Sequence, residues 1–186
     1  EEGVHSFNAS RMAIINNHIY HQKYYGVVHG EFSLAAVYGN EIVENQSIGI
    51  ITESYLDVDI KENKIIGNFQ GGILTSGQSS GSISENFIKN NGTFNLIIRN
   101  EEKVKNINNT IIESEIIVPE LKETNGEYVI EPLDIGTPIN FEKVIEQVQS
   151  NQTIRFLSGV YFLNQPININ KPINLIAEEP DTVFLN

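Results

Sequence analysis

Several residue types are missing or scarce in this chain of 186 residues, and each absence excludes a class of protein. The chain has no Cys, no Trp and only one Met, which excludes a disulfide framework, a Cys-ligated zinc site and a thiol nucleophile. Basic residues are also scarce, since 12 Lys and Arg stand against 24 Asp and Glu, a formal net charge of -12. Nucleic acids and anionic membrane surfaces attract clustered Lys and Arg, so we expect neither as a partner. No apolar run approaches the roughly 18 residues of a membrane-spanning helix.

The main feature that is present is an internal repeat with a period of 23 residues. Asparagine recurs with this period, and an isoleucine lies two residues after each asparagine. A glycine or asparagine lies nine residues after each of the first four, and a short apolar run follows it. The columns are Asn17, Asn40, Asn63, Asn86 and Asn109; Ile19, Ile42, Ile65, Ile88 and Ile111; and Gly26, Gly49, Gly72 and Asn95.

This repeat predicts a solenoid of strands. A helical solenoid would need apolar residues at helical spacing over ten or more positions, whereas here short β-branched runs are separated by Gly and Asn. The period fits one coil of a parallel β-helix, with about three strands per coil and coils stacked ~4.8 Å apart. The isoleucines then form a buried ladder, and the asparagines form an amide ladder in a turn where Asn tolerates the left-handed conformation. The glycine column is expected to supply positive φ at a corner.

The spacing of Asn40, Ile42, Asn45 and Gly49-Ile50 resembles the repeats of the right-handed parallel β-helix (pectate-lyase-like) superfamily. The resemblance covers residues 1 to about 117 and implies an all-β, right-handed parallel β-helix with 23-residue coils. It leaves the function open, because this superfamily includes polysaccharide lyases, hydrolases and epimerases, phage tailspikes and surface adhesins.

The last third of the chain follows a different pattern. Residues 118–135 are predicted to form a linker or hairpin, because Asn125-Gly126 lies between β-rich runs. A short amphipathic helix is predicted after Asn140, which could cap it. Its apolar face would consist of Phe141, Val144, Ile145 and Val148, spaced i, i+3, i+4 and i+7.

The order of elements in residues 136–186 resembles the opening of many pectate-lyase-like β-helices, in which a helix plugs the first coil and strands follow. We therefore expect the coils of one β-helix in residues 1–117, and a capping helix with the first strands of another in residues 136–186. Each β-helix would then have an open edge, and open edges favour head-to-tail self-association.

Charged residues on the predicted coils suggest a catalytic or metal site. Because strand side chains alternate, Asp57, Asp59 and Lys61 should face outward together, while Glu53 and Arg99 should share a column two coils apart. A uronate lyase or epimerase needs Ca²⁺ on carboxylates and an Arg or Lys as the base. Under this hypothesis Glu53, Asp57 and Asp59 bind the metal, and Arg99 and Lys61 are the catalytic groups. The alternative is a solvated face whose charges keep the solenoid soluble.

Histidines and aromatic residues form two further sets. His18 and His21 are close enough in sequence to share a metal, although surface polar residues are the alternative. The aromatic rings are predicted either to stack on sugar rings or to pack against one another at corners. The histidines are His5, His18, His21 and His29, and the aromatic residues are Tyr20, Tyr24, Tyr25, Tyr38, Tyr55 and Phe69.

Together these features predict a recognition or scaffold module that contacts glycans or proteins. The expected location is extracellular or at the cell surface, with an intracellular location left open. A Ca²⁺-dependent lyase or epimerase acting on uronate polymers is the first alternative, and a structural module that assembles head to tail is the second. The sequence leaves open whether the chain is an enzyme, and it implies no cofactor other than Ca²⁺.

Overall fold

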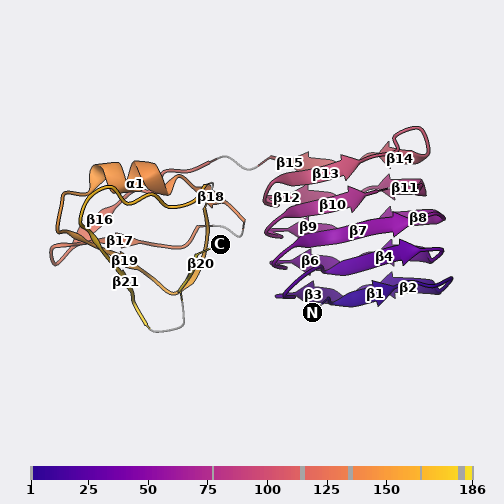
Figure 1. The fold of residues 1–186 in the computed structure, drawn as a ribbon, viewed down its shortest axis with the longest axis horizontal. Helices are drawn as coiled ribbons and strands as arrows, with labels where there is room; N and C mark the ends of the chain where they lie inside the picture. Colours follow the sequence, from indigo (N-terminus) through magenta and orange to yellow (C-terminus); the bar gives the residue numbers. More distant parts are fainter. Residues whose placement is uncertain are drawn as a thin grey trace. The chain divides into compact units, whose positions relative to one another are not determined.

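The chain forms two compact units, residues 1–113 and 114–186, and each is described by itself. The computed structural model describes residues 2–76, 78–113, 116–133, 136–163, 165–179 and 183–185. Parallel strands stacked in coils form the first unit, and short strands with one helix form the second (Figure 1).

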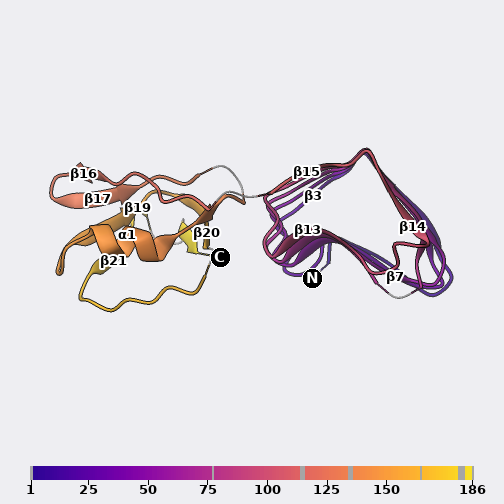
Figure 2. The ribbon, with the colours of Figure 1, turned by 90° about the horizontal axis from the view of Figure 1, so that it is seen from above.

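Each coil of the first unit contributes one strand to each of three parallel sheets. Seen along the stack, the coils superpose on one three-sided outline (Figure 2). Sheet A contains β1 (Val4–Ser6), β4 (Val27–Glu31), β7 (Ile48–Ser54), β10 (Gly71–Thr75) and β13 (Phe94–Ile98). Sheet B contains β2 (Arg11–Ile15), β5 (Leu34–Tyr38), β8 (Asp57–Lys61), β11 (Ser80–Ser84) and β14 (Val104–Ile107). Sheet C contains β3 (His18–Tyr20), β6 (Glu41–Val43), β9 (Lys64–Ile66), β12 (Phe87–Lys89) and β15 (Thr110–Ile112).

The register of the sheets confirms the parallel β-solenoid and its period. Ile42 pairs with Ile65 and Ile65 with Ile88, so like residues stack across coils. Three such apolar ladders, one on each sheet, fill the interior. Each buried aliphatic side chain contributes roughly 1.5–3 kcal/mol relative to exposure. The ladders hold Val27, Ile50 and Ile73 on sheet A; Ile14, Val37, Ile60 and Ile83 on sheet B; and Ile19, Ile42, Ile65 and Ile88 on sheet C.

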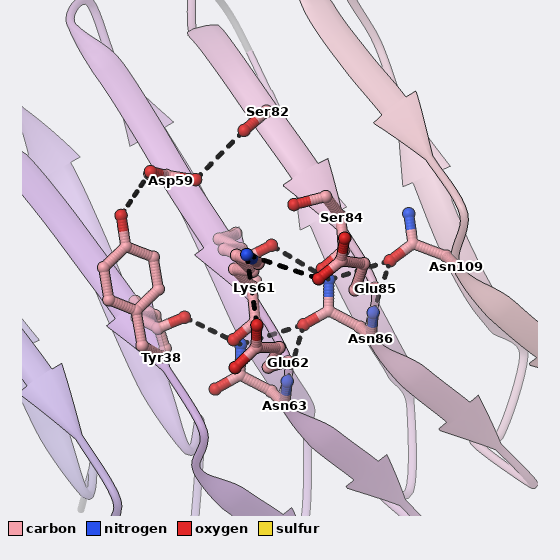
Figure 3. Close-up of polar contacts among 12 residues, drawn as sticks. Tyr38, Asp59, Lys61, Glu62, Asn63, Ser82, Ser84, Glu85, Asn86 and Asn109 are labelled. Carbon is pink, nitrogen blue, oxygen red and sulfur yellow. Dashed lines mark hydrogen bonds and ion pairs between the residues drawn. The ribbon is translucent and has the colours of Figure 1, made fainter.

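The predicted asparagine column is a hydrogen-bonded ladder. The backbone N–H and side-chain amide of Asn63 both donate to Oδ1 of Asn86, at 2.9 Å each, and Asn86 donates in the same way to Asn109 (Figure 3). Asn63 and Asn86 are each 1 % exposed, so the ladder satisfies polar groups that water does not reach. A second ladder, not recognised from the sequence, runs through Asn45, Asn68 and Asn91 with the same 23-residue spacing.

The prediction that the ladder asparagines adopt the left-handed conformation was wrong. That conformation falls on the residue before each ladder asparagine, as at Glu62 (φ 56°) and Glu85 (φ 56°). The bend therefore precedes the ladder residue, whose own N–H and amide must point along the stack toward the next coil. The other left-handed residues at these two corners are Asn16, Gly39 and Asn108, and His21, Glu44, Gly67 and Asn90.

The glycine column has a steric rather than a conformational cause, so the expected positive φ was also wrong. Gly26, Gly49 and Gly72 are not among the residues with positive φ. A Cβ on Gly49 would lie 2.8 Å from Nδ2 of Asn68 and 2.9 Å from the carbonyl oxygen of Gly72. The glycines thus leave room for the amide of the second ladder and for the backbone of the next coil.

The second unit begins with the predicted hairpin. Strands β16 (Lys122–Thr124) and β17 (Glu127–Ile130) are antiparallel, and Asn125 and Gly126 between them have positive φ. One sheet has the order β16-β17-β19-β21 and the other β18-β20-β22. The remaining strands are β18 (Pro138–Ile139), β19 (Thr153–Phe156), β20 (Gly159–Leu163), β21 (Asn174–Ala177) and β22 (Val183–Leu185).

The predicted amphipathic helix is α1 (Phe141–Gln147), and Oδ1 of Asn140 caps it by accepting from the N–H of Lys143 at 3.1 Å. All four residues of the predicted apolar face are buried, at 0 to 3 % exposure. No helix in the described parts of the chain combines the length and the apolar character needed to cross a membrane.

Candidate functional site

The predicted charged cluster lies on the outer face of strand β8. Tyr38 on the preceding coil donates its hydroxyl to Oδ2 of Asp59, and Ser82 on the next coil donates to Oδ1 at 3.0 Å (Figure 3). Ser80 donates to Asp57. Both carboxylates therefore accept hydrogen bonds from hydroxyl groups of neighbouring coils. The hydrogen bond to Asp59 raises the pKa of the Tyr38 hydroxyl.

Lys61 points toward two glutamates at the corner (Figure 3). Its Nζ lies 3.1 Å from Oε1 of Glu62 and 3.3 Å from Oε2 of Glu85. These contacts, first with Glu62 and then with Glu85, raise the pKa of Lys61. A general base must lose its proton near the working pH, so this environment opposes the catalytic role hypothesised for Lys61.

No group of three or more His, Asp or Glu side chains converges on one point within the described residues. Calcium takes six to eight oxygen ligands, whereas Asp57 and Asp59 supply two carboxylates that neighbouring hydroxyls already contact. A Ca²⁺ site here would thus need most of its ligands from a substrate. Binding of Ca²⁺ by Asp57 and Asp59 stays a prediction.

Glu53 and Arg99 lie on a different face, the outer side of sheet A. Gly30 pairs with Glu53, and Ser76 and Arg99 follow the paired residues Thr75 and Ile98 of the next two coils. The column therefore reads Gly30, Glu53, Ser76, Arg99, with Ser76 between the two charged residues. The structure thus does not bring the five predicted residues into one cluster: three lie on sheet B, Glu53 lies on sheet A, and Arg99 directly follows strand β13.

A hollow of about 490 Å³ lies on the outer side of sheet A, next to Glu53. Val28, Gly30, Glu31 and Glu53 are among the residues that line it. Sequence reasoning singled out Glu53 but not this hollow, because a concave surface depends on how neighbouring coils stack.

Aromatic rings border the hollow. Tyr55 lines it and stacks on Phe32, with ring centroids 5.2 Å apart and planes 25° apart. His5 and Phe7 also line it, with centroids 4.8 Å apart. Phe32 and Tyr55 are 58 % and 56 % exposed, so more than half of each residue remains accessible although the two rings stack on each other. Among these rings, Tyr55 was a predicted sugar-stacking residue and Phe32 was not. Phe32 lies 23 residues before Tyr55, and this spacing could have identified it as the partner of Tyr55.

The outer face of sheet A is also apolar beyond the hollow. Val28 and Ile51 face outward on adjacent coils yet are only 8 % and 6 % exposed, because Ile48 and Tyr25 pack against them. These outward aliphatic side chains form a small cluster of their own, separate from the interior ladders and covered by neighbouring side chains.

The histidines do not meet at one metal site. Nε2 of His21 lies 2.8 Å from Oε2 of Glu44, and Nε2 of His18 lies 3.8 Å from Oε2 of Glu41. The ring of Tyr20 lies between them, 4.6 Å from that of His18 and 5.2 Å from that of His21. His29 points into the solenoid and is 0 % exposed.

Comparison with known proteins identifies the repeat. A family model described as a right-handed beta helix region matches residues 1–112. No curated protein and no solved structure matches the chain. The match thus covers the solenoid unit.

Proposed function

We propose, from the premise that this chain belongs to the right-handed β-helix family, that it is a recognition module that binds a glycan on the outer face of sheet A. The extracellular medium or the cell surface is the location we propose with it. The hollow beside Glu53 carries this proposal, because aromatic residues and two glutamates line it together.

The chemistry of the hollow suits a sugar better than a fully apolar ligand. The C–H face of a pyranose packs on aromatic rings and aliphatic side chains, which Tyr55 and Val28 offer. Its hydroxyl groups donate hydrogen bonds, which the carboxylates of Glu31 and Glu53 accept. The lining of the hollow is about evenly divided between polar and apolar surface, which suits a sugar that has both hydroxyl groups and an apolar ring face.

Binding is favoured over a lyase reaction by the surroundings of the predicted base. The two glutamates that contact Lys61 hold its proton. Ser76 separates Arg99 from Glu53 within their column, so the two do not form a compact acid–base pair. The other form of the recognition proposal has a protein surface as the ligand. We favour a sugar, because the exposed rings beside the hollow are suited to stacking on a pyranose.

Binding is measured by calorimetry with the unmodified chain and a panel of neutral, amino and uronate oligosaccharides, each with calcium and with EDTA. Replacing both Phe32 and Tyr55 by Ala should weaken binding about tenfold, since stacked rings supply much of the contact. Tyr24→Ala is the matched control, because Tyr24 is 49 % exposed and lies outside the hollow. A panel without any bound sugar, or equal affinities for both variants, would contradict the proposal.

A further inference from the structure

Gly30 is a glycine for which the fold supplies no reason. It lies inside strand β4, and its φ is not in the left-handed region. A Cβ built on Gly30 would meet no described atom within 4 Å, whereas one on Gly26 would lie 2.6 Å from the oxygen of Gly49. Glycine within a strand weakens it, and it often marks a point where a ligand approaches the backbone closely.

The missing side chain leaves a notch in the outward column of sheet A. Phe7 follows Ser6, which pairs with His29, so Phe7 and Glu53 lie on the two coils that flank Gly30. Adjacent strands are about 4.8 Å apart, so Phe7 and Glu53 stand on either side of Gly30, whose backbone is buried but whose Cβ position is empty. The notch and its two walls are part of the hollow of about 490 Å³.

The charge in the notch is negative. Glu31 and Glu53 line the hollow, and neither takes part in an ion pair of the described residues. By contrast, Glu41 contacts Lys64 at 2.5 Å, and Glu62 contacts Lys61 at 3.1 Å. The carboxylates of the hollow are therefore available to a positively charged group, and the net charge of -12 adds to that preference.

Resting on the proposed function, we infer that the notch over Gly30 is the subsite for one pyranose ring and that it selects a sugar carrying a protonated amine. The ring enters the space that a Cβ of Gly30 would occupy and packs against Phe7, while the ammonium group donates to Glu53 and Glu31. Uronates are disfavoured, because their carboxylates would face like charges.

The first test fills the notch. Gly30→Ser places a small side chain where the ring would lie, and affinity for a glucosamine oligomer should fall roughly tenfold or more. Thermal unfolding should show that Gly30→Ser folds as stably as the unmodified chain. Ala13→Ser is the control, since Ala13 is an exposed strand residue on sheet B. Binding of the glucosamine oligomer with undiminished affinity to Gly30→Ser would overturn the inference.

The second test addresses the charge. Glu53→Gln should reduce affinity for the glucosamine oligomer far more than for an N-acetylglucosamine oligomer, which has no protonated amine. Equal loss for both, or stronger binding of a galacturonate oligomer to the unmodified chain, would overturn the selectivity while leaving glycan binding intact. If no sugar binds but a lysine-rich peptide does so through Glu53, the proposed function fails together with the inference, and the ligand is a protein.

Discussion

Asn95 ends the second asparagine ladder by accepting hydrogen bonds from Asn91 within the same coil. Oδ1 of Asn95 lies 3.2 Å from the backbone N and 3.0 Å from Nδ2 of Asn91. In the preceding coil, the backbone N–H and the side-chain amide of Asn68 donate the same two hydrogen bonds to Oδ1 of Asn91, which lies 23 residues later. Asn95 occupies the column that holds Gly26, Gly49 and Gly72. Its side chain therefore fills the space that those glycines leave for the next coil's amide.

Loss of this cap should destabilise the last coil. Asn95→Gly leaves two donors of Asn91, which is 3 % exposed, without their acceptor. We expect the free energy of unfolding to fall by about 1–3 kcal/mol, as for other unsatisfied buried groups. Urea denaturation measures this, with Asn108→Gly as the control, because Asn108 is exposed and has a φ of 51° that glycine accepts readily. Equal stability of the two variants would show that the cap is dispensable.

Two glycine-to-alanine variants should act in opposite directions. Gly49→Ala brings a Cβ within 3 Å of the Asn68 amide and of a backbone oxygen, so stability should fall by about 1–3 kcal/mol. Gly30→Ala meets open space and should be neutral or stabilising by about 0.5–1 kcal/mol. Thermal unfolding of both variants beside the unmodified chain is the measurement. Destabilisation by Gly30→Ala would mean that Gly30 has a structural role after all.

Stability should depend on pH through His29. Burial lowers the pKa of His29, and a hydrogen bond with the backbone of Ser33 opposes this only in part. Nε2 is buried and has no partner among the described residues, so no acceptor awaits a second proton. The unfolded chain, with a histidine pKa of about 6.5, then binds the proton more readily than the folded chain. Stability is accordingly complete above pH ~6.5 and declines as the pH falls toward the folded pKa.

Urea denaturation between pH 7.5 and pH 5 tests this dependence. His29→Gln should remove the part of the decline due to His29, whatever the stability of the variant at any single pH. His18→Gln is the matched control, since the His18 side chain is 55 % exposed. The same slope in His29→Gln and in the unmodified chain would refute the assignment.

The lyase alternative has a direct assay. Incubation of the chain with uronate polymers and calcium should yield no unsaturated product, because contacts with Glu62 and Glu85 raise the pKa of Lys61 and so oppose its action as a base. Absorbance of the unsaturated uronate measures the reaction. Product formation that disappears in the Asp57→Ala, Asp59→Ala double variant would establish the enzyme instead.

The solenoid was predictable because stacking turns a sequence period into contacts. Residues 23 apart become neighbours in parallel strands, so the isoleucine column and the first asparagine ladder followed directly from the repeat. The face of helix α1 was predictable for the analogous reason, since the spacing from Phe141 to Val148 matches one side of a helix.

Details within a coil were harder to predict from the sequence. The left-handed residue precedes the ladder asparagine, as at Glu62. One residue does not both form the left-handed bend and direct its N–H and amide toward the next coil. The glycine column is required because a side chain from the next coil occupies the space where a Cβ would stand, as Asn68 does beside Gly49. A glycine required for this steric reason looks the same in the sequence as a glycine required by a turn.

The sequence by itself determined the period, the ladders and the column to which each residue belongs, because these depend on spacing alone. Only the tertiary structure decided how the columns meet in space: Asp57 and Glu53 lie on different sheets, and Lys61 turns to Glu62 and Glu85. It also decided that Gly30 opens a notch, whereas Gly49 lies at a tight corner with no room for a Cβ. The physical reason is that concavity and ion pairing depend on the angles between sheets and on side-chain positions across coils, which a one-dimensional period does not specify.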